Sequence, residues 1–155
     1  MAKDMEDKIA LKKKIHEKCL STLEHSAETT RKRIEELQED ANMTEEEHDV
    51  FDGTRNKLLS QRDIYAGQLQ NIINEIQVVN NVNSGKLQDK VDFGAVVKTN
   101  KQNLFIVTGL GKIEVDGEQY FVISRDVPIY KVMEGKKKGD TFEFNNNKFE
   151  IKDVF

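Results

Sequence analysis

The sequence predicts an α+β protein in which an antiparallel coiled-coil helical hairpin precedes a small β domain with one short helix. Three observations carry this prediction. Residues 5–80 contain no Pro and only two Gly, and their apolar side chains recur at helical spacing. Residues 81–90 are rich in Asn and contain Ser and Gly, which is typical of a linker. Residues 91–155 alternate Val, Ile and Phe runs with Gly or Asn turns, which favours an antiparallel sheet.

The first arm of the hairpin is predicted from a row of apolar or small residues. Its members follow one another by three or four positions, which places them on one face of a helix. The row is Ile15, Cys19, Leu23, Ala27, Thr30, Ile34, Leu37 and Ala41. Cys19 is therefore interpreted as a seam residue of the hairpin rather than as a reactive thiol.

The second arm has an even more regular heptad row. It comprises Phe51, Arg55, Leu58, Arg62, Tyr65, Leu69, Ile72, Ile76 and Val79. We expect the chain to turn between the arms at residues 41–44, where Asn42 or Thr44 can cap the second helix. Thr44 followed by Glu47 also matches a capping box. With about 30–35 residues in each arm, the hairpin is expected to be about 45–50 Å long.

Turn residues mark the elements of the β domain. Asp116-Gly117 between two extended runs predicts a hairpin, and Asn145–Asn147 predict a second one. Pro128 suits the first turn of a short helix and Gly135 suits its end. Residues 107–112, "VTGLGK", fail as a phosphate loop, because Ile106 stands where the motif needs Gly and Ile113 where it needs Ser or Thr. We expect a tight turn there.

Composition and charge limit the classes of function. The net charge is −4, with 17 acids and 12 Lys or Arg in residues 1–80, and 11 acids and 12 Lys or Arg in residues 81–155. Neither part has the basic balance of a protein that binds duplex DNA by itself. The single Cys allows no internal disulfide, and no apolar run is long enough for a membrane span. We expect a cytoplasmic protein without a membrane association.

The catalytic possibilities are narrow. Residues 91–155 contain neither His nor Cys, and the three His residues are far apart along the predicted rod, so no self-contained active or metal site is expected. The most concentrated charge is an acidic tip near residues 42–54, with Glu45–Glu47, Asp49 and Asp52. Asp49 and Asp52 are spaced i, i+3 and share one helix face, where they can hold one cation together. The alternative interpretation is a solvated helix start, where the helix dipole stabilises acidic side chains.

The C-terminal residues resemble a known family. Phe93-Gly94, then Ile123-Ser124, Pro128-Ile129, Gly135-Lys136-Lys137 and Gly139-Asp140 follow one another as in the C-terminal domain of the bacterial Gre transcript-cleavage factors. The resemblance covers residues 91–155 in motif and residues 9–80 in architecture. It implies an FKBP-like C-terminal domain behind the coiled-coil hairpin. FKBP-like prolyl isomerase activity is not expected, because such sites usually have a Trp floor and this chain has no Trp.

The resemblance also implies a partner and a chemistry. Gre factors bind RNA polymerase at its secondary channel, and their tip acids help to hold Mg²⁺ while the polymerase cleaves the 3′ end of backtracked RNA. By this likeness Asp49 and Asp52 would be the catalytic acids and would share the Mg²⁺ only in the complex, so the chain alone needs no cofactor. Arg55 and Lys57 follow the tip and would contact RNA phosphates.

The implied polymerase-binding residues are Ser124, Pro128 and Ile129. The alternative interpretation of them is fold maintenance, as a strand end, a helix start and a core contact. The tip departs from the family, since Gly53-Thr54-Arg55-Asn56 stands where the family usually has Asn-Ala-Glu-Tyr, and Glu45–Glu47 are added. Two alternatives therefore stay open. One is a Gre-like regulator that occupies the channel without cleavage, and the other is a coiled-coil adaptor or chaperone.

Overall fold

The computed structural model describes residues 2–46 and 52–155 of the chain. Contacts divide them into two compact units, each treated by itself here: Ser21–Gln77 form one, and Met1–Leu20 together with Val78–Phe155 form the other. The predicted limits of independently folding parts, 1–80 and 91–155, stay predictions. Within the described residues, no helix combines the length and the apolar character needed to cross a bilayer.

Two long helices form the N-terminal part, α1 (Ala2–Glu46) and α2 (Asp52–Asn80). The prediction of a turn at 41–44 is wrong, because α1 continues through these residues. Thr44 does not cap α2; its hydroxyl donates to the Asp40 carbonyl within α1 at 2.9 Å. The physical reason is local: no Pro or Gly interrupts the run before Gly53, and an i, i+4 side-chain hydrogen bond from Gln38 to Asn42 supports the last turns.

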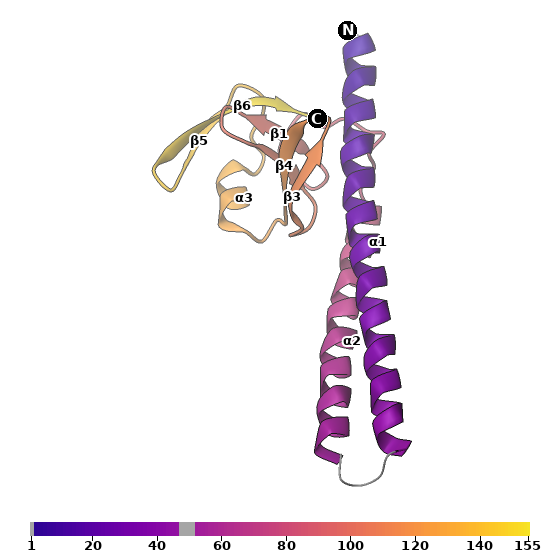
Figure 1. Cartoon of the computed structure of the whole chain (residues 1–155). Helices are drawn as coiled ribbons and strands as arrows, with labels where there is room; N and C mark the ends of the chain where they lie inside the picture. Colours follow the sequence, from indigo (N-terminus) through magenta and orange to yellow (C-terminus); the bar gives the residue numbers. More distant parts are fainter. Residues whose placement is uncertain (1, 47–51) are drawn as a thin grey trace. The chain divides into compact units, whose positions relative to one another are not determined.

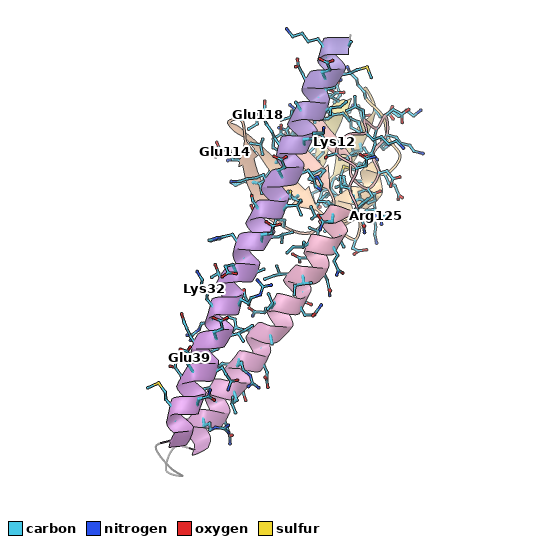
Figure 2. The ribbon with its side chains drawn as sticks, turned by 90° about the vertical axis from the view of Figure 1, so that its right-hand side faces the viewer. Lys12, Lys32, Glu39, Glu114, Glu118 and Arg125 are labelled. Carbon is cyan, nitrogen blue, oxygen red and sulfur yellow. The ribbon has the colours of Figure 1, made fainter. Side chains whose placement is uncertain are left out.

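Within the unit 21–77, α1 and α2 lie side by side and run antiparallel (Figure 1). The seam predicted for α1 is confirmed, since Leu23, Ala27, Leu37 and Ala41 are buried. The α2 seam is only half-buried along Leu58 to Ile76. The outer side of α1 is charged, and Figure 2 shows Lys32 and Glu39 on the side turned away from α2.

The C-terminal residues form one mixed sheet and a short helix, as the predicted α+β class requires. The elements are β1 (Val96–Thr99), β2 (Asn103–Ile106), β3 (Gly111–Val115), β4 (Glu118–Ile123), α3 (Pro128–Met133), β5 (Thr141–Phe144) and β6 (Asn147–Val154). The strand order is β3-β4-β2-β1-β6-β5. Four of the pairs are antiparallel as expected, but β2 and β4 are parallel, because the β3–β4 hairpin returns β4 along the same direction as β2.

Both faces of the central strands are buried. One face carries the main apolar cluster, which includes Tyr130 and Met133 of α3 and the stacked rings of Phe142 and Phe149, 4.9 Å apart. Alternate residues of the same strands point to the opposite face. These are Val96, Phe105, Tyr120 and Val122, and they are buried as well.

The first turns of α1 belong to this unit and are tied to it by ion pairs. Lys8 contacts Asp153 of β6 at 3.0 Å, and Lys14 contacts Asp116 of the β3–β4 turn at 3.2 Å. Ile15 is fully buried. Both pairs are long-range in sequence and tie the first turns of α1 to the sheet.

The predicted turns of the β domain are confirmed. Asp116 and Gly117 have φ values of 52° and 80° between β3 and β4, and Asn145 and Asn146 have 50° and 64° between β5 and β6. Such paired positive values match the right-handed twist of a two-residue hairpin. Pro128 begins α3, and Gly135 follows its end with φ 76°.

Candidate functional site

The acid-rich segment predicted as the tip stands where α1 ends and α2 begins. Glu45 and Glu46 are the last residues of α1, and Asp52 is the first residue of α2. Asp49 and Glu47 lie outside the described residues, so the predicted pairing of Asp49 with Asp52 stays a prediction. Gly53 follows in the first turn of α2, with open space on the side where a Cβ would stand.

The two predicted RNA-contacting residues lie on α2 but on different faces. Lys57 is exposed, whereas Arg55 is partly buried. Residues two positions apart on a helix do not face the same side. The structure therefore does not bring the two cations together, and Lys57 is the more exposed of the two.

A polar contact between α1 and α2 is made by Arg62 and Gln38. Arg62 of α2 donates to the Gln38 side chain of α1, and the same guanidinium is paired with Asp63 at 2.8 Å. Arg62 itself is only half-buried on the α2 seam, because a charged side chain on a helix–helix seam keeps its charged group near water. The heptad row had already shown Arg62 as a polar position; the Gln38 partner was not predictable from it.

The predicted polymerase-binding segment is the loop from β4 into α3. Ser124 is half-buried, and its hydroxyl oxygen accepts the Asp126 N–H at 3.3 Å. Pro128 is exposed at the first position of α3, and Ile129 packs against the apolar cluster. A structural contribution is therefore visible for Ser124 and Ile129, while the exposed part of the loop comprises Asp126, Pro128 and the neighbouring Arg125.

Sequence reasoning missed Arg125. Its guanidinium lies over the Phe93 ring at 5.1 Å, a cation–π distance. Figure 2 labels this side chain. The contact joins the Phe93-Gly94 pair to the loop before α3, so two motifs that are far apart in the sequence form one surface. The signal available in the sequence was an Arg directly after the Ile123-Ser124 pair.

A second missed residue is Lys12 of α1, whose side chain is only 1% exposed. Its Nζ donates to the Lys86 carbonyl oxygen at 2.8 Å and to Gln88 Oε1 at 3.2 Å. Burial, with a smaller contribution from the Lys86 charge, lowers the pKa of Lys12 to about 8. Lys12 stands three positions before Ile15 and continues the spacing of the apolar row, which was the signal available in the sequence.

One helical turn further along α1, His16 makes a similar contact. Its Nε2 lies 2.7 Å from the Val79 carbonyl oxygen, which is one of the last carbonyls of α2. The same carbonyl oxygen also accepts the Val82 N–H at 3.1 Å, so the His16 Nε2–H is a second donor to it at the end of α2. Lys12 and His16 thus hold the end of α2 and the segment after it against α1.

The described residues contain no group of three or more His, Cys, Asp or Glu side chains that could hold a metal ion. Cys19 is buried, and its pKa is raised to about 12 by desolvation, so the thiol is unreactive at neutral pH.

The chain was compared with protein families, curated sequences and solved structures. No protein-family model and no curated protein sequence matches the chain. Among solved structures, the GreA factor homologue 1 (Gfh1) of Thermus thermophilus is similar over 88% of this chain and 94% of its own, with 16% identity and a TM-score of 0.34. A second structure, of the transcription factor Gfh1, covers 88% and 93%, with 14% identity and a TM-score of 0.33. Similarity at this level does not establish a shared activity or partner.

Proposed function

We propose that the chain is a Gre-like transcription factor that binds the secondary channel of RNA polymerase and promotes Mg²⁺-dependent cleavage of backtracked RNA. The observation that supports it most is the acid-rich segment 45–52 at the junction of two long antiparallel helices. A helix of 29 residues, the length of α2, extends about 44 Å. The order of motifs in residues 93–140, which resembles the Gre C-terminal domain, is the second support.

The distribution of charge explains why the acids would act inside another protein. Two carboxylates in water hold Mg²⁺ weakly, because the ion keeps its own waters. Among the described residues, no three or more His, Cys, Asp or Glu side chains form a group that could hold a metal ion. Acids at the end of a helical pair can instead complete a metal site that a partner already holds.

In this proposal Asp49 would coordinate the shared Mg²⁺, and Asp52 would share the ion or orient the attacking water. A metal-bound water is a strong nucleophile toward a phosphodiester. Lys57 is exposed on α2 and would meet RNA phosphates. Arg55 is partly buried on α2 and would be the second contact to RNA phosphates.

The test is a transcript-cleavage assay on a stalled, backtracked elongation complex. Asp49→Asn with Asp52→Asn keeps the size of both side chains and removes two charges, so cleavage should fall by orders of magnitude while polymerase binding persists. Replacing Glu45, Glu46 and Glu47 by Gln is the matched control and should change cleavage much less. If the triplet matters and the Asp pair does not, the assignment of the acids is wrong.

A second candidate is a channel-binding regulator without cleavage activity. The tip sequence favours it, because Gly53-Thr54-Arg55-Asn56 departs from the pattern usual in cleavage-stimulating members. The wild-type chain would then bind the polymerase and slow RNA synthesis or cleavage without stimulating either. If the chain fails to bind core polymerase at all, both forms of the proposal fall, and a coiled-coil adaptor is left.

The proposed contact with polymerase is tested separately. Pro128→Ala removes an exposed side chain from the start of α3, and Arg125→Ala removes the charge over Phe93. Each should weaken binding to core polymerase in a pull-down or an interferometry titration. Lys148→Ala, on β6 at the exposed β5–β6 hairpin, is the control and should bind as the wild type does.

A further inference from the structure

Lys12 is an unusual buried lysine, because both of its hydrogen-bond partners are neutral. Lysine is almost never fully buried unless it is paired. Here the side chain is 1% exposed, and its acceptors are a backbone carbonyl, that of Lys86, and the amide oxygen of Gln88. A neutral amine has two N–H donors, which match these two acceptors. An ammonium group has a third N–H and a full charge to accommodate.

The surrounding charges do not offset that charge. Lys8, one turn before Lys12 on α1, is already paired with Asp4 and Asp153, and His16 one turn later donates to a backbone carbonyl. On the facing segment, the Lys86 ammonium repels the protonated form. Asp89 on the same segment is exposed, and the Asp92 carboxylate accepts the Phe93 N–H at 2.7 Å.

The Gln88 side chain links Lys12 to the residues that precede the first strand of the sheet. Its oxygen accepts from Lys12, and its Nε2 donates to the Phe93 carbonyl oxygen at 2.9 Å. Phe93 precedes Gly94, whose N–H donates to the Ile106 carbonyl oxygen at 2.6 Å. A cavity of about 190 Å³ opens beside this chain of contacts, lined in part by Val82, Gln88 and Gly94. Within this segment the backbone of Lys90 bridges to Lys137, and the Val91 N–H donates to the Lys136 carbonyl oxygen at 2.8 Å. Residues 82–89 lie outside any helix or strand, so the Lys12 and Gln88 contacts carry more of their order.

We propose that Lys12 is a proton-controlled latch between α1 and the segment 82–94: the neutral amine fastens the segment, and protonation favours its local opening. The inference is independent of any polymerase partner. Opening exposes Lys12 to water, where it regains its ordinary affinity for a proton, so the open form binds more protons than the closed form. With the pKa of Lys12 at about 8 when closed against 10.5 when open, the opening constant should fall about tenfold from pH 7 to pH 9.

The experiment is amide hydrogen exchange of the full chain at pH 7 and pH 9, corrected for intrinsic exchange rates and resolved for residues 82–94. The wild type should be about tenfold better protected in this segment at pH 9. Residues 141–154 of the β5–β6 hairpin should not show this change. Lys13→Met, an exposed neighbour on α1, should behave as the wild type does.

Two variants of Lys12 separate charge from packing. Lys12→Met keeps the length of the side chain and cannot titrate, so the pH dependence should disappear whatever the absolute protection. Lys12→Arg stays charged at both pH values, so its segment should stay loosely protected at pH 9. If Lys12→Met is too unstable, the ¹³Cε NMR titration of the wild-type lysines decides, since one lysine must titrate near pH 8 and its signal must be absent from Lys12→Arg. Equal protection of the wild type at both pH values, or an unchanged pH dependence in Lys12→Met, would overturn the latch.

Discussion

Gly94 offers a test of the backbone geometry at the start of the sheet. Its φ is +85°, in the left-handed region that residues with a Cβ avoid. An added Cβ would lie 3.5 Å from Val82 Cγ1 and 3.6 Å from Gln88 Oε1, which are ordinary van der Waals distances. The cost of Gly94→Ala is therefore conformational rather than steric.

The magnitude follows from two opposing effects. Holding alanine in the left-handed region costs about 1–2 kcal/mol. Alanine also restricts the unfolded chain, which stabilises the folded state by about 0.4–1 kcal/mol. The free energy of unfolding should therefore fall by about 1 kcal/mol in Gly94→Ala.

Gly109→Ala is the matched control. Gly109 lies outside the left-handed region, with open space where the Cβ would stand, so only the unfolded-state effect remains and the variant should be as stable as the wild type or slightly more so. Urea unfolding followed by near-UV circular dichroism reports on Tyr120 and Tyr130, which are buried in the same unit as both glycines. Equal stability of the two alanine variants would refute the left-handed assignment, and a loss well above 2 kcal/mol would refute the absence of a clash.

Three further predictions concern the β domain. Phe149→Leu removes the ring stacked on Phe142 and leaves a partly filled space, so the free energy of unfolding should fall by about 1–3 kcal/mol in urea denaturation; an unchanged midpoint would contradict the packing. Tyr120→Phe deletes the hydroxyl that donates to Glu118 at 3.2 Å and should cost about 0.5–1.5 kcal/mol, measured in the same way. Lys98 holds the pKa of Glu118 below its ordinary value, so the pair stabilises the fold above pH 4.5 and this contribution is lost as the pH falls through the folded-state pKa. Lys98→Met should flatten that acid limb in a pH series of thermal unfolding, and a limb identical to that of the wild type would show that the pair contributes nothing.

Much of the fold could be read from local rules. The seam of α1 was predicted because a helix buries one stripe, and Leu23, Ala27 and Leu37 repeat at that spacing. The β hairpins were predicted because Asp116-Gly117 and Asn145-Asn146 tolerate positive φ. The acidic segment and its helical arms were also visible, since charge and periodicity are properties of the chain itself.

Other features depended on which segments meet in space. The end of α1 was predicted too early because Thr44 and Glu47 match the pattern of a helix cap. Continuing the helix through Glu46 satisfies more backbone hydrogen-bonding groups than a turn at 41–44 would. The parallel β2–β4 pair follows from a crossover that residue patterns do not encode. Arg125 over Phe93 and Lys12 on Gln88 join residues 32 and 76 positions apart, and only the tertiary structure brings such partners within reach. The sequence by itself determined most of the helices and turns and the position of the acidic segment. The three-dimensional packing decided which polar groups are removed from water, and therefore that Lys12 is buried with a lowered pKa.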